Sequence, residues 1–442
     1  MSGAFDRIAD FALGAPEIPG SARAMAARLL IDTVAVTAGA ASLEVGRIAR
    51  DLAVDLYGPG SGEWSAPIMF DGRRASLAGA AFAAATQTDN LDAHDGLNPT
   101  KGHIGCAVVP ALIAFAERRP GLRGRAALDA LVIAYEIAAR AAIALHGSVS
   151  DYHTSGAWNG LGVAALGVRL MGGEKRALRH ALGIAEYHGP RSQMMREIDN
   201  PTMLHDGSGM GALVGVSSAV MSMRGFTGAP AITVEGAEVS PIWDDLGSDW
   251  TIERNYIKPY PVCRWAHAAL DATRALMRAE GFGAGDVAKV RVATFAEAAR
   301  LFPGMPDTTS KAQYSLGFAV ATMLRKGAIG PDDVSGAALS DTETAKMIDR
   351  IEIVEDARHS SRFPAGRWSD VAIDTYDGRR FASGDVHARG GPEAPMSNVE
   401  FAEKLTALAG APLAEALLTL EATLPEDAPF SGMTDLTAQA LK

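Results

Sequence analysis

The sequence is poor in cysteine: its 442 residues include only Cys106 and Cys263. Two cysteines cannot form the disulfide framework of a small secreted protein, so we expect a reducing compartment, the cytoplasm. The same count excludes a 4Fe-4S cluster of the aconitase type, which needs three cysteine ligands even when one iron stays open.

Basic runs and long apolar segments are also absent. The 41 Lys+Arg against 52 Asp+Glu give a formal net charge of -11, so we expect no nucleic-acid partner. The longest uncharged stretch near the middle, residues 207–223, has only 17 residues and is interpreted as a buried helix, not a membrane span. Residues 1–14 carry acids early and lack a long apolar core, so we expect no signal peptide. A small-molecule partner fits these exclusions.

Two familiar motifs are missing as well. The glycine pairs at 160–162 and 207–211 do not follow strands, which excludes a dinucleotide fingerprint. No metal-ligand spacing of the HExxH kind occurs, and we find no internal repeat.

What the sequence has instead is one stretch dense in titratable groups. Residues 88–116 read TDNLDAHDGLNPTKGHIGCAVVPALIAFA. Glycine and proline interrupt the Ala-rich helix pattern of residues 74–86, and an apolar helix pattern starts again at Cys106. The polar groups are therefore predicted to lie on a loop between two buried helices, where acids and bases are commonly presented to a substrate. They are Asp89, Asp92, His94, Asp95, Thr100, Lys101 and His103.

Apolar spacing near 3.6 residues predicts that residues 1–255 are almost entirely helical, with glycine or proline between the helices. The predicted helices are residues 22–40, 74–86, 107–118, 124–145, 156–170 and 175–187.

The pattern changes after Lys258. Helix patterns at 263–279 and 312–325 alternate with strand patterns at 290–293, 351–354 and 370–376, and Asp377-Gly378 is the strongest hairpin signal in the chain. Residues 398–420 return to helix. We therefore predict a large all-helical domain from residues 1–255 and 394–442, with a smaller α+β lid domain, residues 256–393, inserted between them.

Five segments occur in a characteristic order and spacing. They are DNLDAHDGLNPTKGHIG with CAVVPAL, YHTSGAWNGLGVAAL, PTMLHDGSGMGALVG with RGFTGAP, IKPYPVCRWAHAALDA, and AQYSLGFAVATMLRKG. Together they resemble the MmgE/PrpD family, which includes 2-methylcitrate dehydratase, cis-aconitate decarboxylase and an iminodisuccinate epimerase. The resemblance implies a helical domain with an α+β lid, a homodimer, a site in the cleft, and no metal or organic cofactor.

His103 is the first candidate catalytic residue. It follows Gly102 and precedes Gly105, and a neutral imidazole is suited to proton transfer near pH 7. It matches a family active-site histidine, and Asp95 matches another site position. Asp92 is expected to orient a histidine or contact the substrate; capping a helix is the alternative. Thr100 and Lys101 are expected to bind substrate, the lysine as partner of the nearby carboxylates.

The same carboxylates and histidines can be interpreted as a metal site, because they are hard or borderline ligands. We expect no metal, since no fixed ligand spacing accompanies them.

Two further histidines are candidate catalytic residues. His153 precedes a Gly-rich helix whose N-terminus, with Thr154 and Ser155, is suited to an anion, and it matches a second family histidine. His205 stands where many family members carry a lysine, and an imidazole there has a very different working pKa. Capping or packing is the alternative for both.

Lys258 lies in KPYP at the junction of the two predicted domains and matches a family lysine. We expect it to bind a substrate carboxylate as the domains close. Arg264 is a candidate carboxylate clamp and His267 lies one turn further along the same helix. Phe318 falls where decarboxylases of the family carry a tyrosine, although Tyr314 is close in sequence.

Together with the resemblance, these residues predict a cofactor-independent lyase that removes a proton alpha to a carboxylate of a small di- or tricarboxylate. Dehydration of the 2-methylcitrate type is the leading reaction. Epimerisation and decarboxylation share its carbanion-like intermediate and stay open. A carboxylate-binding protein without activity is the rival from another class.

Overall fold

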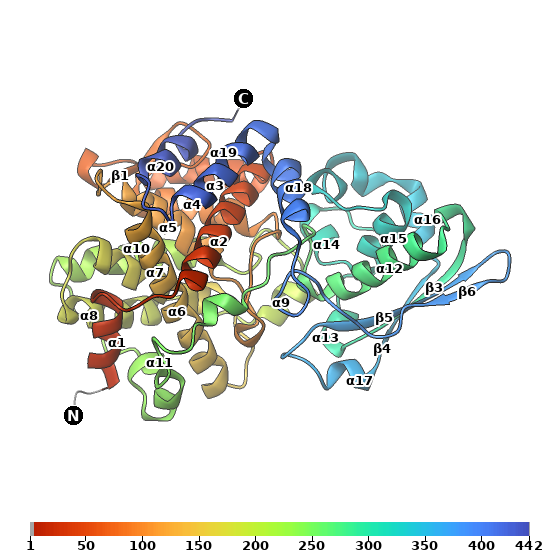
Figure 1. Ribbon diagram of the computed structural model, residues 1–442, viewed down its shortest axis with the longest axis horizontal. Helices are drawn as coiled ribbons and strands as arrows, with labels where there is room; N and C mark the ends of the chain where they lie inside the picture. Colours follow the sequence, from red (N-terminus) through yellow and green to blue (C-terminus); the bar gives the residue numbers. More distant parts are fainter. Residues whose placement is uncertain (1–3, 442) are drawn as a thin grey trace.

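The computed structural model describes residues 4–441, which fold into a large helical lobe and a smaller lobe with a sheet (Figure 1). The mainly α class with a smaller α+β part is thus confirmed. The principal elements of the helical lobe are α1 (Ala4–Leu13), α2 (Gly20–Gly39), α3 (Glu44–Leu56), β1 (Ser65–Pro67), β2 (Arg74–Ser76), α4 (Leu77–Asp89), α5 (Gly105–Ala116), α6 (Gly124–Ser148), α7 (Gly156–Leu170), α8 (Lys175–His188), α9 (Met194–Asp199), α10 (Ser208–Met223), α11 (Ile232–Glu235), α18 (Asn398–Ala409), α19 (Ala411–Thr423) and α20 (Ser431–Thr437).

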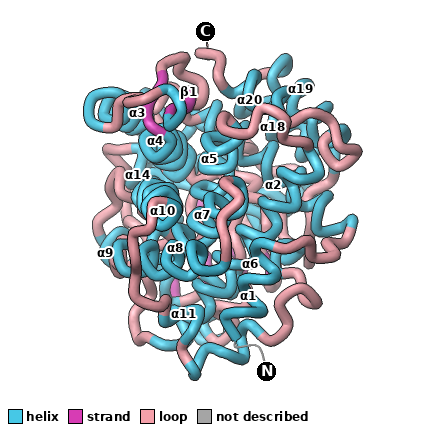
Figure 2. The backbone as a smooth tube through the Cα atoms, turned by 90° about the vertical axis from the view of Figure 1, so that its left-hand side faces the viewer, coloured by secondary structure: helices cyan, strands magenta, loops and turns pink. Residues whose placement is uncertain are grey.

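Helix α7 occupies the centre of the helical lobe, where it contacts α5, α6, α8 and α10 (Figure 2). Small residues permit these close approaches. A Cβ added at Gly162 would lie 2.5 Å from the carbonyl oxygen of Ala134 on α6, and one at Gly215 would lie 2.6 Å from that of Gly160 on α7. Among residues 4–441, no single helix is both long and apolar enough to cross a membrane, although α2 and α3, bent by 96°, pass that test as a pair.

The smaller lobe contains a five-stranded sheet. Its elements are α12 (His267–Glu280), β3 (Val287–Thr294), α13 (Ala296–Ala299), α14 (Thr309–Gln313), α15 (Leu316–Lys326), α16 (Thr342–Ile348), β4 (Ile351–Glu355), α17 (Ala357–Ser360), β5 (Trp368–Thr375), β6 (Arg380–Ala382) and β7 (Val386–His387).

The strands run in the order β4-β3-β5-β6, with β7 also paired to β5. Strands β3 and β4 are parallel, and the other pairs are antiparallel. Every second residue of β5 is buried, and α12 packs against this strand. The predicted hairpin at Asp377-Gly378 is confirmed: it joins β5 to β6, with Asp374 opposite Arg380.

Two hydrophobic cores underlie the lobes. One takes residues from the first 257 positions and from 401–433, and the other takes residues 194, 198 and 260–373. Helices α18 and α19 pack on α2, which brings the end of the chain back to the helical lobe (Figure 1). The domain boundaries at 255/256 and 393/394 stay a prediction.

Several predicted elements differ in detail. Residues 74–76 form strand β2 instead of the start of a helix, so the helical lobe also holds a β1–β2 hairpin. The predicted helix 312–325 is split between α14 and α15 because Ser315 caps α15: its side chain accepts the N–H of Phe318. The predicted helix 398–420 is broken at Gly410, where the backbone has φ 75° and ψ 156°.

Gly410 generates a first prediction. Its backbone conformation is essentially restricted to glycine, so Gly410→Ala is expected to lower the free energy of unfolding by about 1–3 kcal/mol, measured by urea denaturation. Gly20→Ala is the matched control, because an added Cβ at Gly20 meets nothing within 4 Å and the residue begins a helix with ordinary φ. Equal stability of both variants would contradict the expected backbone strain of an alanine at position 410.

Candidate active site

A small cavity lies where the two lobes meet. Its volume is about 20 Å³, measured for the centres of water-sized spheres, and this is room for about one water molecule. Its lining residues are Asp92, Lys101, His103, Tyr152, Met194, Ile198, Asp206, Tyr256, Lys258, Cys263, Arg264, Trp265, Tyr314 and Arg367.

The loop between α4 and α5, predicted from its glycines and prolines, supplies one wall of the cavity. Two of its residues, Asp92 and Lys101, adopt left-handed backbone with φ of 57° and 53°. Gly96 pairs with Tyr256 through two main-chain hydrogen bonds of 3.1 and 2.8 Å, which tie the loop to the segment entering the smaller lobe. A side chain at Gly96 would lie 2.3 Å from the Tyr256 hydroxyl and 2.9 Å from Nδ1 of His103.

His103 is held in one tautomer. Its Nδ1 lies 2.6 Å from the carbonyl oxygen of Asp95, which can only accept, so we assign the ring proton to Nδ1. Nε2 is then an unprotonated acceptor, 3.8 Å from Oδ2 of Asp206. Burial, and then the charge of Lys258, hold the pKa of His103 well below its ordinary value, so the ring is a neutral base at pH 7.

Asp206, the residue after His205, faces that base and was not among the predicted site residues. Ser155 donates to Oδ1 of Asp206 from its hydroxyl at 2.5 Å and from its main-chain N–H at 3.1 Å. The N-terminus of α7, predicted to receive a substrate anion, thus binds a carboxylate of the protein itself. Burial, with Asp89 nearby, raises the pKa of Asp206 to about 6.

Lys258 is fully buried and forms an ion pair with Asp92. Its ammonium also donates to the main-chain oxygen of Asp92 at 3.0 Å. Burial acts to lower the pKa of Lys258, but the Asp92 carboxylate outweighs it, and the pKa is raised. The lysine expected to bind a substrate carboxylate is therefore already paired across the two lobes.

Two buried arginines carry the positive charge of the cavity. Arg264 is 3% exposed, donates to the carbonyl oxygens of Arg389 and Ala388, and lies 4.1 Å from the Tyr256 ring. Arg367 is 2% exposed and donates to the carbonyl oxygens of Pro364 and Gly366.

Neither arginine forms an ion pair with a carboxylate of residues 4–441. The Nε atoms of both arginines are buried and have no hydrogen-bond partner among residues 4–441. Burial lowers the pKa of Arg264 to about 10, which still leaves it charged at neutral pH. Lys101 adds a third cation, and burial and then Arg367 lower its pKa.

Three phenols complete the wall. Tyr152, Tyr256 and Tyr314 line the cavity, and burial raises the pKa of each, so all three stay protonated. Sequence reasoning considered only Tyr314. Arg367 was missed because its segment has no local signal, and Tyr152 was missed although it directly precedes the candidate His153.

Besides His205, which is described below, four predicted site residues do not line the cavity. Asp95 accepts from the Tyr135 hydroxyl at 3.2 Å, so its side chain faces the helical core and only its main chain holds His103. The Thr100 hydroxyl donates to the carbonyl oxygen of Leu97 at 2.9 Å within the loop.

The other two are His267 and His153. His267 is fully buried, and its Nε2 lies 3.0 Å from the carbonyl oxygen of Val262. His153 is partly exposed, and its main-chain N–H donates to Nε2 of His146. Their catalytic and binding roles stay predictions that this cavity does not support.

His205 lies just behind the wall. It is 2% exposed, has φ 47°, and its ring centroid is 5.2 Å from that of Tyr314. Burial, and then the charges of His94 and Lys258, lower the pKa of His205 to about 3. It is a neutral ring where the resemblance implies a lysine.

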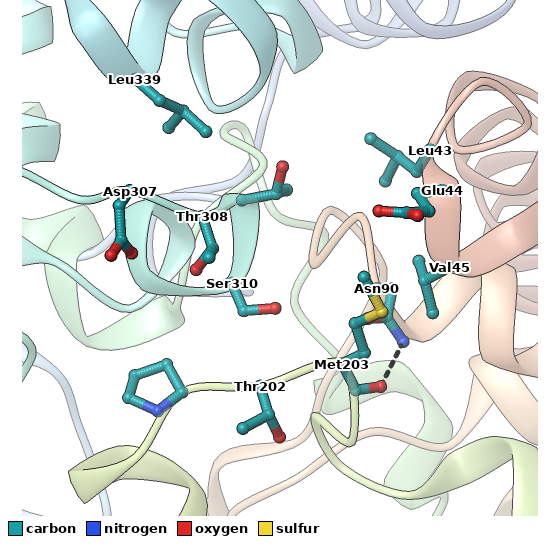
Figure 3. A pocket seen from close by; sticks show the side chains of 12 residues that line it. Leu43, Glu44, Val45, Asn90, Thr202, Met203, Asp307, Thr308, Ser310 and Leu339 are labelled. Atoms are coloured by element: carbon teal, nitrogen blue, oxygen red, sulfur yellow. Dashed lines mark hydrogen bonds between the residues drawn. The ribbon is translucent and has the colours of Figure 1, made fainter.

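A larger cavity of about 480 Å³ lies along the same interlobe seam (Figure 3). Leu43, Glu44 and Val45 line one side of it and residues 307–310 the other, and Asn90 donates to the main-chain oxygen of Met203 in its wall at 3.1 Å. Its lining residues, all within the described chain, include no Lys, Arg or His. This larger cavity therefore offers no cationic side chain to an anion, whereas the small cavity does.

Two groups of side chains resemble metal-ligand sets. Asp89, His94 and Cys106 lie together in the helical lobe, and His359, Asp370 and Asp385 lie in the smaller one.

Neither group is assigned as a metal site. Burial and the charge of Asp89 raise the pKa of Cys106 well above its ordinary value, which disfavours a thiolate ligand. In the other group, Arg358 already forms ion pairs with Asp370 and Asp385.

Fold and cavity define a mainly helical protein of two lobes whose seam encloses cations, phenols and a neutral histidine. Models of the MmgE/PrpD N-terminal domain and the MmgE/PrpD C-terminal domain match residues 6–238 and 260–424. The chain belongs to the MmgE/PrpD family, as its sequence segments suggested, and membership supports a function of the dehydratase and lyase type. A search of curated proteins found no significant match.

The Asp92–Lys258 pair generates a second prediction. Lys258→Met should leave a buried carboxylate without its partner and lower the free energy of unfolding by about 3–5 kcal/mol, measured by urea denaturation. The double variant Asp92→Asn/Lys258→Met should recover much of this loss. If Lys258→Met has the same free energy of unfolding as the wild-type protein, the ion pair does not stabilise the fold and the lysine is available to bind a substrate.

Proposed function

We propose that the protein is a lyase that removes a proton alpha to a carboxylate of a small di- or tricarboxylate without a cofactor, with dehydration of the 2-methylcitrate type as its reaction. The observation that carries the proposal is the pair of buried guanidinium groups, Arg264 and Arg367, with no carboxylate of the described chain in salt-bridge contact. Charges of one sign are buried at high cost unless an opposite charge joins them. A polycarboxylate supplies that charge.

The proton acceptor in this proposal is Nε2 of His103. Its tautomer is fixed by the Asp95 carbonyl oxygen, and its low pKa keeps it unprotonated at pH 7. Loss of the alpha proton builds negative charge on the adjacent carboxylate. Arg264, Arg367 and the Tyr256 hydroxyl are placed to stabilise that charge with pre-oriented donors.

A dehydration also needs an acid for the departing hydroxyl. Asp206, with its pKa raised to about 6, and the Tyr314 phenol both line the cavity. Base and acid then stand on different segments around one substrate, which is the arrangement that general acid–base catalysis requires.

Decarboxylation is the second candidate, and one observation favours it. Phe318 lies in the core of the smaller lobe, but Tyr314, four residues earlier, lines the cavity and stays protonated. Tyr314 can therefore supply the proton that quenches a carbanion after loss of carbon dioxide. Epimerisation of a dicarboxylate would need the returned proton to reach the opposite face of the same carbanion.

The deciding experiment is proton NMR of the purified protein in heavy water. The panel contains 2-methylcitrate, citrate, cis-aconitate, tartrate-like and aspartate-derived diacids, each with and without chelator. We expect exchange of the alpha hydrogen that survives the chelator, with loss of water from one acid. Release of carbon dioxide or inversion alone would select the other reactions. Binding without exchange would favour a carboxylate-binding protein, and light scattering of the same sample tests the expected homodimer.

His103 gives a third prediction. His103→Ala should lower the rate of exchange or turnover at least about a hundredfold, since it removes the base. The matched control is His188→Ala, an exposed histidine on α8. Unchanged far-UV circular dichroism would show that the variant is folded, and a folded variant with full activity would reject His103 as the base.

Arg367 gives a fourth prediction. Arg367→Gln should lower kcat/KM about 10–100-fold, because a charge-assisted contact to the substrate is lost. Arg379→Gln, on the exposed β5–β6 hairpin and paired with Asp377, is the control. Kinetics with the acid identified by NMR give the measurement, and identical kcat/KM values for both variants would contradict an anion site at Arg367.

A further inference from the structure

A buried carboxylate and a buried imidazole face one another behind the cavity. Oδ1 of Asp89, at the end of α4, lies 3.5 Å from Nε2 of His94. Asp89 is 2% exposed and His94 fully buried, and neither atom has another hydrogen-bond partner among residues 4–441. Two bare acceptors would repel each other, so a proton belongs between them.

The remaining contacts of the pair decide where that proton resides. Nδ1 of His94 lies 3.3 Å from the carbonyl oxygen of Asp95, which only accepts. Nδ1 therefore carries the ring proton, and Nε2 is the acceptor. The proton between the two side chains then belongs to Asp89, whose other oxygen accepts the main-chain N–H of Ser208 at 3.0 Å.

The local charges favour the same state. Nearby, Lys258 is paired with Asp92 and Lys404 with Asp32, so both lysines are already neutralised. The carboxyls of Asp95 and Asp206 lack a lysine or arginine partner in the described chain, and the Cys106 thiol adds only a further acidic group. One more charge on Asp89 would have no cation to balance it.

The pair contacts the proposed base directly. The ring of His94 packs edge-on against His103 with centroids 4.4 Å apart, and both rings bond to the carbonyl oxygen of Asp95. The tautomer of His94 therefore helps to fix the ring of His103, with its Nε2 toward the cavity.

We propose that Asp89 and His94 form a neutral pair that shares one proton and positions His103. Neither residue lines the cavity, so both are positioning residues, not groups that touch the substrate. The inference deepens the proposed function and rests on it only for the role given to His103. The pair itself is a statement about protonation that can be tested without any substrate.

The pH dependence of stability follows from this state. An unfolded Asp89 ionises near pH 4, whereas burial raises its pKa in the folded protein to about 7. Between these values folding takes up a proton, so the stability contributed by this group is present below pH 4 and is lost as pH rises through 7.

The test compares wild-type protein with Asp89→Asn in urea unfolding from pH 5 to 8.5. Relative to the variant, the unfolding equilibrium constant of the wild type should rise about tenfold per pH unit between pH 5 and 7 and then level off. Asp435→Asn, an exposed carboxylate on α20, is the control and should follow the wild-type slope. Equal slopes for wild type and Asp89→Asn would overturn the proposal.

A second measurement keeps the test valid if Asp89→Asn folds poorly. Nitrogen-15 NMR of wild-type protein labelled at histidine, assigned with His94→Gln, should show His94 neutral with its proton on Nδ1 at pH 6. An imidazolium signal, or a stoichiometric metal ion bound at His94, would overturn the proposal. If no acid in the panel exchanges hydrogen, the proposed function fails. The unfolding and NMR measurements would still show whether Asp89 and His94 share a proton.

Discussion

The ion pair between Asp92 and Lys258 joins the loop after α4 to the segment between the two lobes, and the charge balance of the site depends on it. Asp92 belongs to the loop after α4, and Lys258 to the segment that leaves the helical lobe. Both side chains are almost completely excluded from water, where a charge without its partner is strongly destabilising. The pair therefore ties the loop after α4 to the segment between the lobes, within the lining of the cavity.

This constraint determines which charges remain for a ligand. Lys258 is neutralised by Asp92, and the N-terminus of α7 is occupied by Asp206. Arg264 and Arg367 are held instead by main-chain oxygens, which orient a guanidinium without cancelling its charge. The net positive charge at the seam is thus carried by arginines, whose planar fork suits a carboxylate. A small cavity with that charge is suited to an anionic ligand.

Much of the fold was predictable from the sequence, because its helices are marked by apolar period and by glycine or proline at their ends. The loop before α5 was recognisable for the same reason, and His103 within it. Local pattern could not reveal Arg367 or Tyr152, which reach the cavity only through the packing of distant segments. Nor could it tell that His267 faces Val262 or that Asp95 uses its carbonyl oxygen, since one turn of a helix or one peptide bond decides which way a group points.

The histidine at position 205 is consistent with the same charge balance. A lysine there would place a further cation beside Tyr314 and close to Lys258, in a region where Arg264 and Arg367 already lack carboxylate partners among the described residues. A histidine whose pKa burial lowers to about 3 adds no charge at neutral pH and keeps a ring against Tyr314. In the proposed reaction, proton abstraction then falls to His103, the neutral ring whose free nitrogen faces the cavity, while Arg264, Arg367 and Lys101 supply the charge that the ligand must match.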